Sequence, residues 1–133
     1  MPPSNLELAR RGFEALNSGD LEGLMDLVAD DIVAEVPSGF ANASTYHGRD
    51  GFRRMMDEWL DPWSSFEAKP LDYVEEEDAV VVTVHQRGTG RESGIEVDMT
   101  LAYLIRARDG LMVGWRLCAG ADEALMLARS AWP

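Results

Sequence analysis

The stretch from Ala15 to Pro37 constrains the fold most, because it closes one helix, begins a second and leads into a strand. The Asn-Ser-Gly turn at residues 17–19 is typical of a helix C-terminus. Asp20 is a favoured N-cap residue, and apolar residues then recur with helical spacing over residues 21–28. An Asp-Asp pair ends this second helix, and apolar residues alternate over 32–36 up to the proline. The stretch therefore predicts a helix–helix–strand unit.

The spacing of apolar residues predicts further helices on either side of this unit. Ser4 and Glu7 have the spacing of a capping box, which indicates that the first helix begins there. A third helix from about Arg49 to Leu60 has the most strongly amphipathic pattern in the chain, and Pro62 lies near its end. Asp122 is expected to cap a short helix at the C-terminal end.

From residue 64 onward the apolar period changes to two, which is the period of strands. Pro70 lies inside the first of these strands, so we expect that strand to be bulged or at an edge of the sheet. The predicted strands are Phe66–Val74, Ala79–Arg87, Ile95–Ala107 and Leu111–Ala119. Asp109 and Gly110 have the sequence of a tight hairpin turn. Helices early and a strand meander late predict an α+β fold, with helices on one face of an antiparallel sheet.

Length and charge limit the classes of function that this chain can have. Its 133 residues have the length of one domain, residues 1–133. With 24 acidic and 12 basic residues the net charge is −12, which disfavours nucleic acid and anionic membrane as partners. Cys118 is the single cysteine, so no internal disulfide is expected, and two histidines disfavour a zinc site. We therefore expect no metal and no cofactor. We also expect a cytoplasmic location, because no signal peptide or 18-residue apolar stretch is present.

Five short motifs, in this order along nearly the whole chain, resemble the nuclear-transport-factor-2-like superfamily. They are Asn17–Leu21, Ala29–Asp31, Tyr46–Gly48, Gly94 at the start of the long strand, and Arg108–Gly110. Within the superfamily the chain most resembles SnoaL-like polyketide cyclases and ketosteroid isomerases. The resemblance implies a cystatin-like α+β barrel, in which a curved antiparallel sheet wraps around helices as a cone with an apolar pocket at one end. Because this fold hosts enzymes, binding proteins and subunit adaptors, it implies no activity by itself.

Alternation along the strands predicts which residues face the interior of the implied cone. The apolar sets, which we expect on the concave face, are Val80, Val82, Val84 and Gln86, then Met99, Leu101, Tyr103 and Ile105, then Val113, Trp115, Leu117 and Ala119. The opposite face carries the polar residues His85, Arg87, Asp98, Thr100, Arg106 and Arg116. Relatives often form a two-fold dimer through that face, so the resemblance implies a homodimer here as well.

The residues with which ketosteroid isomerases transfer protons are replaced in this chain. The resemblance places their general base at Val36, their phenolic donor near Gly12 and their protonated aspartate near Leu101. None of these three side chains can transfer a proton, so we predict no steroid isomerase activity. Many relatives also carry an acid near the end of the last strand, where this chain has Gly120.

Few polar groups remain for chemistry in the implied pocket. His47 and Tyr103 are the catalytic candidates, and His47 is the one with an ordinary pKa suited to a general base, although the simpler interpretation of His47 is a solvated residue in a loop before a helix. The residues predicted to bind a ligand are Phe13, Val36, Phe40, Tyr46, Met56, Trp59, Trp63, Val84, Gln86, Leu101, Tyr103 and Trp115. Among them, Tyr103 and Gln86 would orient a carbonyl or hydroxyl group. The Trp and Met side chains of the third helix either line the pocket or fill an ordinary core.

Two classes of function follow from this arrangement. The first is a pocket protein that binds a small hydrophobic molecule, or a dimeric adaptor that uses the same fold for association. The alternative is an enzyme that catalyses proton transfer or aldol-type cyclisation on a carbonyl substrate. The enzyme lacks a buried carboxylate, so Tyr103, Gln86 and His47 would have to act in its place. A titratable residue on the inner face with a strongly shifted pKa would favour the enzyme.

Overall fold

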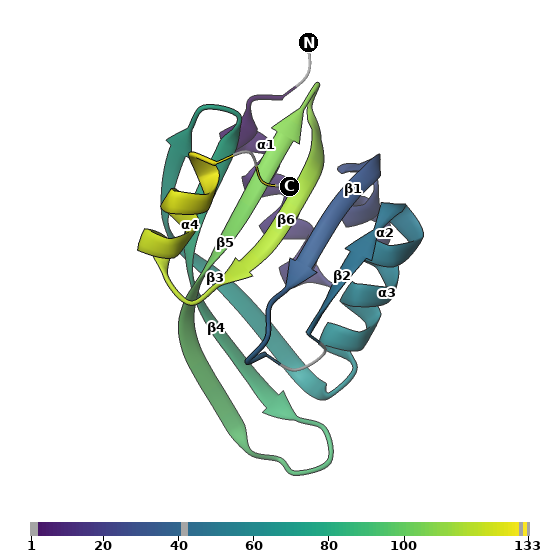
Figure 1. The fold of residues 1–133 in the computed structure, drawn as a ribbon. Helices are drawn as coiled ribbons and strands as arrows, with labels where there is room; N and C mark the ends of the chain where they lie inside the picture. Colours follow the sequence, from purple (N-terminus) through teal and green to yellow (C-terminus); the bar gives the residue numbers. More distant parts are fainter. Residues whose placement is uncertain (1–2, 41–42, 131, 133) are drawn as a thin grey trace.

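The computed structural model describes residues 3–40, 43–130 and 132, which form a six-stranded curved sheet and the helices packed on it (Figure 1). The elements are α1 (Asn5–Ser18), α2 (Leu21–Met25), β1 (Val28–Val36), β2 (Ser44–His47), α3 (Gly48–Leu60), β3 (Trp63–Glu76), β4 (Ala79–Gly90), β5 (Glu96–Arg108), β6 (Leu111–Cys118) and α4 (Ala121–Ala128). This arrangement confirms the predicted α+β class. None of the helices in the described part of the chain has the length and apolarity that a membrane crossing requires.

The strands are ordered β2-β1-β6-β5-β4-β3, and the last four form the predicted antiparallel meander. β3 lies at an edge and its register shifts between Pro70 and Asp72, which confirms the prediction of a bulged or edge strand. Asp109 and Gly110 both have positive φ, as a two-residue hairpin requires. The prediction of a wholly antiparallel sheet is wrong for β1, which lies parallel to β6.

Local capping explains where α1 and α2 begin and end. The Ser4 hydroxyl accepts a hydrogen bond from the Glu7 N–H at 3.1 Å, which confirms the predicted start of α1. Gly19, at φ 75°, ends α1 in the left-handed conformation that glycine favours. The Asp20 carboxylate then accepts from the Gly23 N–H at 2.9 Å and caps α2.

The second helix is shorter than its apolar spacing predicts. It ends at Met25, and β1 already begins at Val28, so the Asp-Asp pair at residues 30–31 lies inside a strand and does not break a helix. Arg49 of α3 explains this ending, because its guanidinium donates to the Met25 carbonyl at 2.7 Å and to the Val28 carbonyl at 2.6 Å. These bonds satisfy carbonyl groups that a longer helix would have used internally.

Three smaller expectations about the elements are also wrong. The small and polar residues from Ser38 to Gly48 predict a loop, but Ser44–His47 form the strand β2, in which Tyr46 is the one buried residue and no alternation is present. Gly120, not Asp122, is the N-cap of α4, and Asp122 lies in the first turn. On β6, a register shift against β5 places Met112 in the core cluster, whereas the predicted inward residue Val113 is half-buried outside that cluster.

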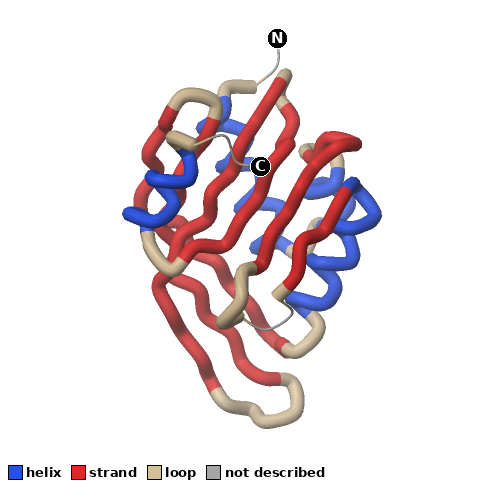
Figure 2. Tube along the Cα trace, in the orientation of Figure 1, coloured by secondary structure: helices blue, strands red, loops and turns tan. Residues whose placement is uncertain are grey.

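Helices cover both faces of the sheet, not one as predicted (Figure 2). α1, α2 and α3 contribute to the large core cluster on the concave face, together with the predicted inward residues Val80, Val82, Val84, Leu101, Tyr103, Ile105, Trp115 and Leu117. α4 covers part of the opposite face, where Ala124 and Ala128 form a second buried cluster with Leu104 and Cys118. That part of the outer face is therefore apolar and covered by α4.

Arg106 shows how the outer face differs from a solvated polar surface. It points to the outer face as predicted, but it is only 8% exposed. Its guanidinium contacts the Asp78 carboxylate and donates to the Ala128 carbonyl at 3.2 Å, at the C-terminal end of α4. The arginine thus joins the β3–β4 turn to α4 and is held by both.

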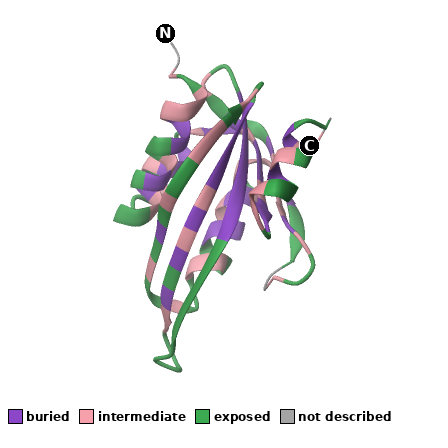
Figure 3. Ribbon diagram, turned by 90° about the vertical axis from the view of Figure 1, so that its left-hand side faces the viewer, coloured by how far each residue is buried: buried purple, intermediate pink, exposed green. Residues whose placement is uncertain are grey.

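The ends of β4 and β5 project beyond the other strands as a long hairpin. Residues 91–100 are all exposed, and Figure 3 shows them as the uncovered tip of the molecule. Arg91 ties this tip to the α3–β3 connection, because its backbone N–H donates to the Pro62 carbonyl at 2.7 Å and its guanidinium donates to the Trp63 carbonyl at 2.9 Å. β4 therefore extends to Gly90, past the predicted end at Arg87.

Candidate functional site

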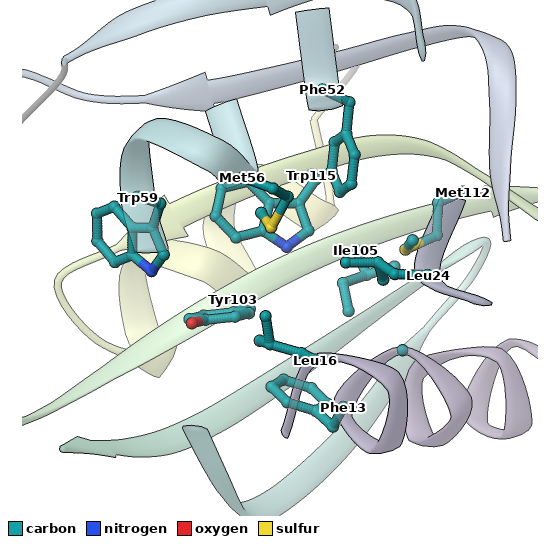
Figure 4. A pocket seen from close by; sticks show the side chains of 11 residues that line it. Phe13, Leu16, Leu24, Phe52, Met56, Trp59, Tyr103, Ile105, Met112 and Trp115 are labelled. Atoms are coloured by element: carbon teal, nitrogen blue, oxygen red, sulfur yellow. The ribbon is translucent and has the colours of Figure 1, made fainter. Parts of the chain in front are cut away.

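An apolar cavity of about 20 Å³ lies between the helices and the concave face of the sheet (Figure 4). It is lined by Gly12, Phe13, Leu16, Leu24, Phe52, Met56, Trp59, Tyr103, Ile105, Met112 and Trp115. Gly12, Leu16 and Trp59 keep some exposure while the other lining residues are buried, so the cavity approaches the surface between α1 and α3. A volume of this size has room for about one water molecule.

A chain of aromatic rings forms the wall of the cavity. The ring centroids of Phe13 and Tyr103 are 5.3 Å apart, those of Tyr103 and Trp115 are 5.1 Å apart, and those of Trp115 and Phe52 are 6.3 Å apart. All three separations lie in the favourable range for aromatic pairs. Because the four rings come from α1, β5, β6 and α3, their packing fixes how the helices sit against the sheet.

A buried pair of polar groups, Tyr103 and Gln86, lies beside the cavity. The Tyr103 hydroxyl donates to the Gln86 side-chain oxygen at 2.6 Å, and both residues are buried. Burial raises the pKa of Tyr103 well above its ordinary value of 10.0, so the phenol stays protonated at neutral pH. Tyr103 is therefore a hydrogen-bonding group in this cavity and not a general base.

Trp59 supplies the second polar group, and it has no partner. The Nε1 atom of Trp59 is buried and makes no hydrogen bond to any described residue. In Figure 4 this nitrogen and the Tyr103 oxygen are turned to the same end of the cavity. The apolar cavity thus has hydrogen-bonding groups concentrated at one end, which suits a molecule with one polar end.

The structure brings together part of the set of residues predicted to bind a ligand. Those that line the cavity are Phe13, Met56, Trp59, Tyr103 and Trp115. The predicted residues that do not line it are Val36, Phe40, Tyr46, Trp63, Val84, Gln86 and Leu101. Of these, Val36, Val84 and Leu101 are buried core residues, and Phe40 is a half-buried loop residue packed against that core.

Tyr46 and His47, expected at the rim of the pocket, lie elsewhere. Tyr46 is buried, and its hydroxyl donates to the Glu58 carboxylate at 3.0 Å; burial and this carboxylate raise the pKa of the phenol. His47 is the exposed N-cap residue of α3 and makes no capping hydrogen bond with its side chain. The position of His47 therefore agrees with a solvated residue and gives it no access to the cavity.

Trp63 packs on the hairpin instead of lining the cavity. A Cβ atom placed on Gly88 of β4 would lie 2.7 Å from the Trp63 ring, so only glycine leaves room for the indole there. Trp63 continues the helical spacing of the apolar residues of α3 in the sequence, which predicts that it faces the same way, but the helix ends at Leu60 and β3 begins at Trp63. Periodicity alone does not carry across such a boundary.

The lining residues that the sequence analysis did not single out as ligand-binding are Gly12, Leu16, Leu24, Phe52, Ile105 and Met112. Phe52 and Ile105 belong to the predicted inward faces of α3 and β5, so the available signal was their periodicity. Gly12 gave no such signal, because the absence of a side chain becomes informative only when the facing residues are known.

Metal and nucleophile chemistry find little support in the described residues. No three His, Cys, Asp or Glu side chains among them come together as metal ligands. Burial, with the nearby Glu123 carboxylate, raises the pKa of the Cys118 thiol to about 11, so the thiol stays protonated at neutral pH. The cavity itself is lined by neither carboxylates nor histidine.

A curved sheet that encloses helices and an apolar cavity defines a cone-shaped α+β pocket domain. The chain belongs to the SnoaL-like domain family, whose model matches residues 9–115. Curated protein sequences give no match to the chain.

Solved structures agree with this assignment. A loop-truncation variant of IdmH is 31% identical, with a TM-score of 0.73 and coverage of 95% of this chain and 98% of the other. A protein from Sinorhizobium meliloti described as a putative polyketide cyclase is 22% identical, with a TM-score of 0.70 and coverage of 84% and 93%. TerC, co-crystallised with polyporic acid, is 18% identical, with a TM-score of 0.78 and coverage of 95% and 98%. The last two establish similarity of fold.

Proposed function

We propose that the cavity binds a small, mainly apolar molecule that carries a carbonyl or hydroxyl group at one end. The observation that carries this proposal is the unpartnered Nε1–H group of Trp59, which is buried at the edge of an apolar cavity. A buried donor without an acceptor costs about 1–3 kcal/mol of stability. An oxygen atom of a bound molecule removes that cost, whereas an apolar molecule of the same shape does not.

The Tyr103–Gln86 pair supports the same orientation of the ligand. Its hydroxyl oxygen and the Trp59 nitrogen are turned to one end of the cavity, while the remaining lining is aliphatic, aromatic or thioether. The polar end of the ligand therefore lies between Tyr103 and Trp59, and its apolar body lies against Trp115 and Phe52. TerC, a protein of the same fold, was co-crystallised with polyporic acid.

The ligand enters where the lining residues are least buried. A cavity of about 20 Å³ is too small for a bicyclic molecule, so side chains must move when the molecule binds. Leu16 of α1 and Trp59 of α3 are half-buried at this position, and the adjacent Met56 has a flexible side chain. Rotation of these side chains enlarges the cavity without disturbing the buried aromatic wall.

A matched pair of ligands tests the proposal. 1-Tetralone and tetralin have the same bicyclic skeleton and differ by a carbonyl oxygen. Isothermal titration should show tighter binding of tetralone, by roughly 5- to 10-fold for one net hydrogen bond. The Trp59→Phe variant should lose that preference, while the control Trp63→Phe, outside the cavity, should keep it. Absence of binding by both compounds, or equal binding by the wild type, would contradict the proposal.

A second candidate function is cyclisation of a carbonyl substrate in the same cavity. It is favoured by the position of the free Trp59 N–H at one end of the cavity, since a donor so placed can stabilise a developing oxyanion. The cavity lining contains no carboxylate or histidine to remove a proton. Catalysis would therefore depend on orientation and on polarisation of the carbonyl. Turnover of a poly-β-ketone model compound that is lost in Trp59→Phe would favour this candidate over binding alone.

A further inference from the structure

One half of β5 has an open edge inside an otherwise paired sheet. β5 pairs with β4 along its length, from Glu96 opposite Thr89 to Arg106 opposite Ala79. On its other side, pairing with β6 starts only at Ala102 opposite Cys118. Between Glu96 and Leu101, no strand in the described ranges pairs with this side of β5. This segment lies in the projecting hairpin of Figure 1, where residues up to Thr100 are exposed.

The outermost strand β3 shows how this protein protects an edge elsewhere. Pro70 and a register shift interrupt β3, and both features block pairing with another strand. The side chain of Asn17 also occupies that edge, because its amide donates to the Ala68 carbonyl and accepts from the Ala68 N–H, each at 2.8 Å. The open half of β5 has neither a proline nor a register shift against β4.

The open half of β5 also has the side-chain pattern of a strand that can receive a partner. Val97 and Met99, which are 38% and 40% exposed, continue the inward-facing series of Leu101 and Tyr103. Glu96 and Asp98 alternate with them on the outer face. The segment thus presents free backbone groups, uncovered apolar side chains on one face and acidic side chains on the other.

We propose that this edge, Glu96–Leu101, binds an extended peptide of alternating apolar and basic residues as an additional antiparallel or parallel strand. Backbone hydrogen bonds to the free edge supply the affinity, as in other cases of strand addition. Apolar side chains of the peptide cover Val97 and Met99, while basic side chains lie beside Glu96 and Asp98. The chain's net charge of −12 further favours a basic partner.

A second copy of this chain fits the same edge poorly. Antiparallel pairing of the segment with itself, centred on Val97, places Glu96 of each copy opposite Asp98 of the other, and like charges on neighbouring strands are destabilising. Charged residues on an edge are a common means of preventing self-association. The acids therefore disfavour a second copy and at the same time attract a basic peptide.

The added strand would also lengthen the wall of the cone near the candidate ligand site. It continues the line of β6 beyond Cys118, on the side of β5 that has no partner strand among the described residues. In the β4–β5 register, Met99 lies opposite Gln86, whose oxygen accepts the hydrogen bond of Tyr103. Inward side chains of the peptide thus lie over the end of the sheet that leads to this polar pair. The strand therefore extends the wall around the candidate ligand site.

Hydrogen exchange with synthetic peptides tests this proposal independently of ligand binding in the cavity. The probes are a hexapeptide of alternating Lys and Val, the same peptide with Glu in place of Lys, and a Lys/Val peptide with alternate backbone nitrogens methylated. The Lys/Val peptide should slow exchange of the edge-facing amides in residues 96–101 by at least ~10-fold at saturation, because these N–H groups become hydrogen-bonded. The Glu/Val and methylated peptides should give no protection.

A charge-reversed variant provides the matched control. Glu96→Lys combined with Asp98→Lys should reverse the preference toward the Glu/Val peptide by at least ~10-fold in affinity, because the complementary charges are exchanged. Neither residue contacts the cavity, so binding of tetralone should not change. Failure of the Lys/Val peptide to bind, binding without amide protection, or an unchanged preference in the variant would overturn the proposal. So would protection in the protein alone that grows with its concentration, which would identify a second copy as the occupant.

Discussion

The hydrogen bond between Tyr103 and Gln86 can be tested by a double-mutant cycle that measures a polar interaction inside the core. Tyr103 is 2% exposed and Gln86 is 5% exposed, so water cannot easily replace a lost partner. Tyr103→Phe removes the hydroxyl and leaves the Gln86 oxygen without its donor at 2.6 Å. We expect this change to lower the free energy of unfolding by about 1–3 kcal/mol, which is the cost of an unsatisfied buried group.

The second half of the cycle is Gln86→Met, which keeps the length of the side chain and removes its polar atoms. Alone it leaves the Tyr103 hydroxyl without an acceptor and should cost a similar amount. In the double variant both polar groups are gone, so the protein should regain part of the loss. The coupling free energy between the two changes should be roughly 1–2 kcal/mol.

Urea unfolding followed by tryptophan fluorescence gives the four free energies, since the chain contains four Trp residues. The dependence on urea should have the same slope in all variants if each unfolds in one step. Tyr73→Phe is the control, because Tyr73 is a half-buried tyrosine whose ring stacks with Arg10 at 5.6 Å on the outside of α1. Strictly additive effects of the Tyr103 and Gln86 changes would refute the argument that the two groups form one unit.

The remaining predictions concern stability and assembly. Asn17→Ala should lower the free energy of unfolding by about 1–2 kcal/mol through loss of both hydrogen bonds to β3, whereas Ser18→Ala at the same helix end should have little effect by the same urea assay. Trp115→Ala should cost about 3–5 kcal/mol because the ring is 5% exposed, and a value near zero would show that the ring contributes no packing. Stability should fall as pH rises above about 10, because Tyr103 ionises near 10 in the unfolded chain but stays protonated in the fold, and alkaline titration of Tyr103→Phe should show a shallower fall. We also propose a homodimer through the outer sheet face not covered by α4, which sedimentation velocity at micromolar concentration should detect; a monomer would remove this proposal.

Features that depend on near neighbours in the chain could be predicted from the sequence. The caps formed by Ser4 and Asp20 and the turn at Asp109 and Gly110 each involve residues within a few positions of one another. The inward faces of β4 and β5 followed from alternation, because a strand with one apolar set has one way to bury it. These elements, with the motifs shared with the family, were sufficient to predict the fold.

Features that depend on pairing between distant segments could not be predicted in the same way. β2 is a strand because Ser44–His47 pairs with β1, and its own four residues contain no alternating pattern. α4 lies on the outer face because Ala124 and Ala128 are small enough to pack closely on Leu104 and Cys118. Small residues carry a weak apolar signal, so we predicted from the sequence that the outer face of the sheet would be polar.

The candidate site was harder to predict than the fold, because its volume depends on side-chain packing. The sequence indicated aromatic residues around a pocket, but Trp63 turns to the hairpin and Tyr46 turns to Glu58. What remains is a small cavity, and Leu16, Met56 and Trp59 are among the side chains that line it. No periodicity argument gives that result, since α1, which carries Leu16, and α3, which carries Met56 and Trp59, are far apart in the sequence.

The polar groups at this cavity argue that it has a role beyond packing. An unpartnered Trp59 N–H at a cost of about 1–3 kcal/mol is a large fraction of a domain's net stability of about 5–15 kcal/mol. Phenylalanine at the same position would fill an apolar core without that group, and Phe or Leu would likewise replace Tyr103 if packing were the sole requirement. The chain instead keeps a donor and a buried phenol at one end of an otherwise apolar space. A molecule with one oxygen at that end satisfies the donor and fills the space, so the same atoms that weaken the empty protein would strengthen the complex.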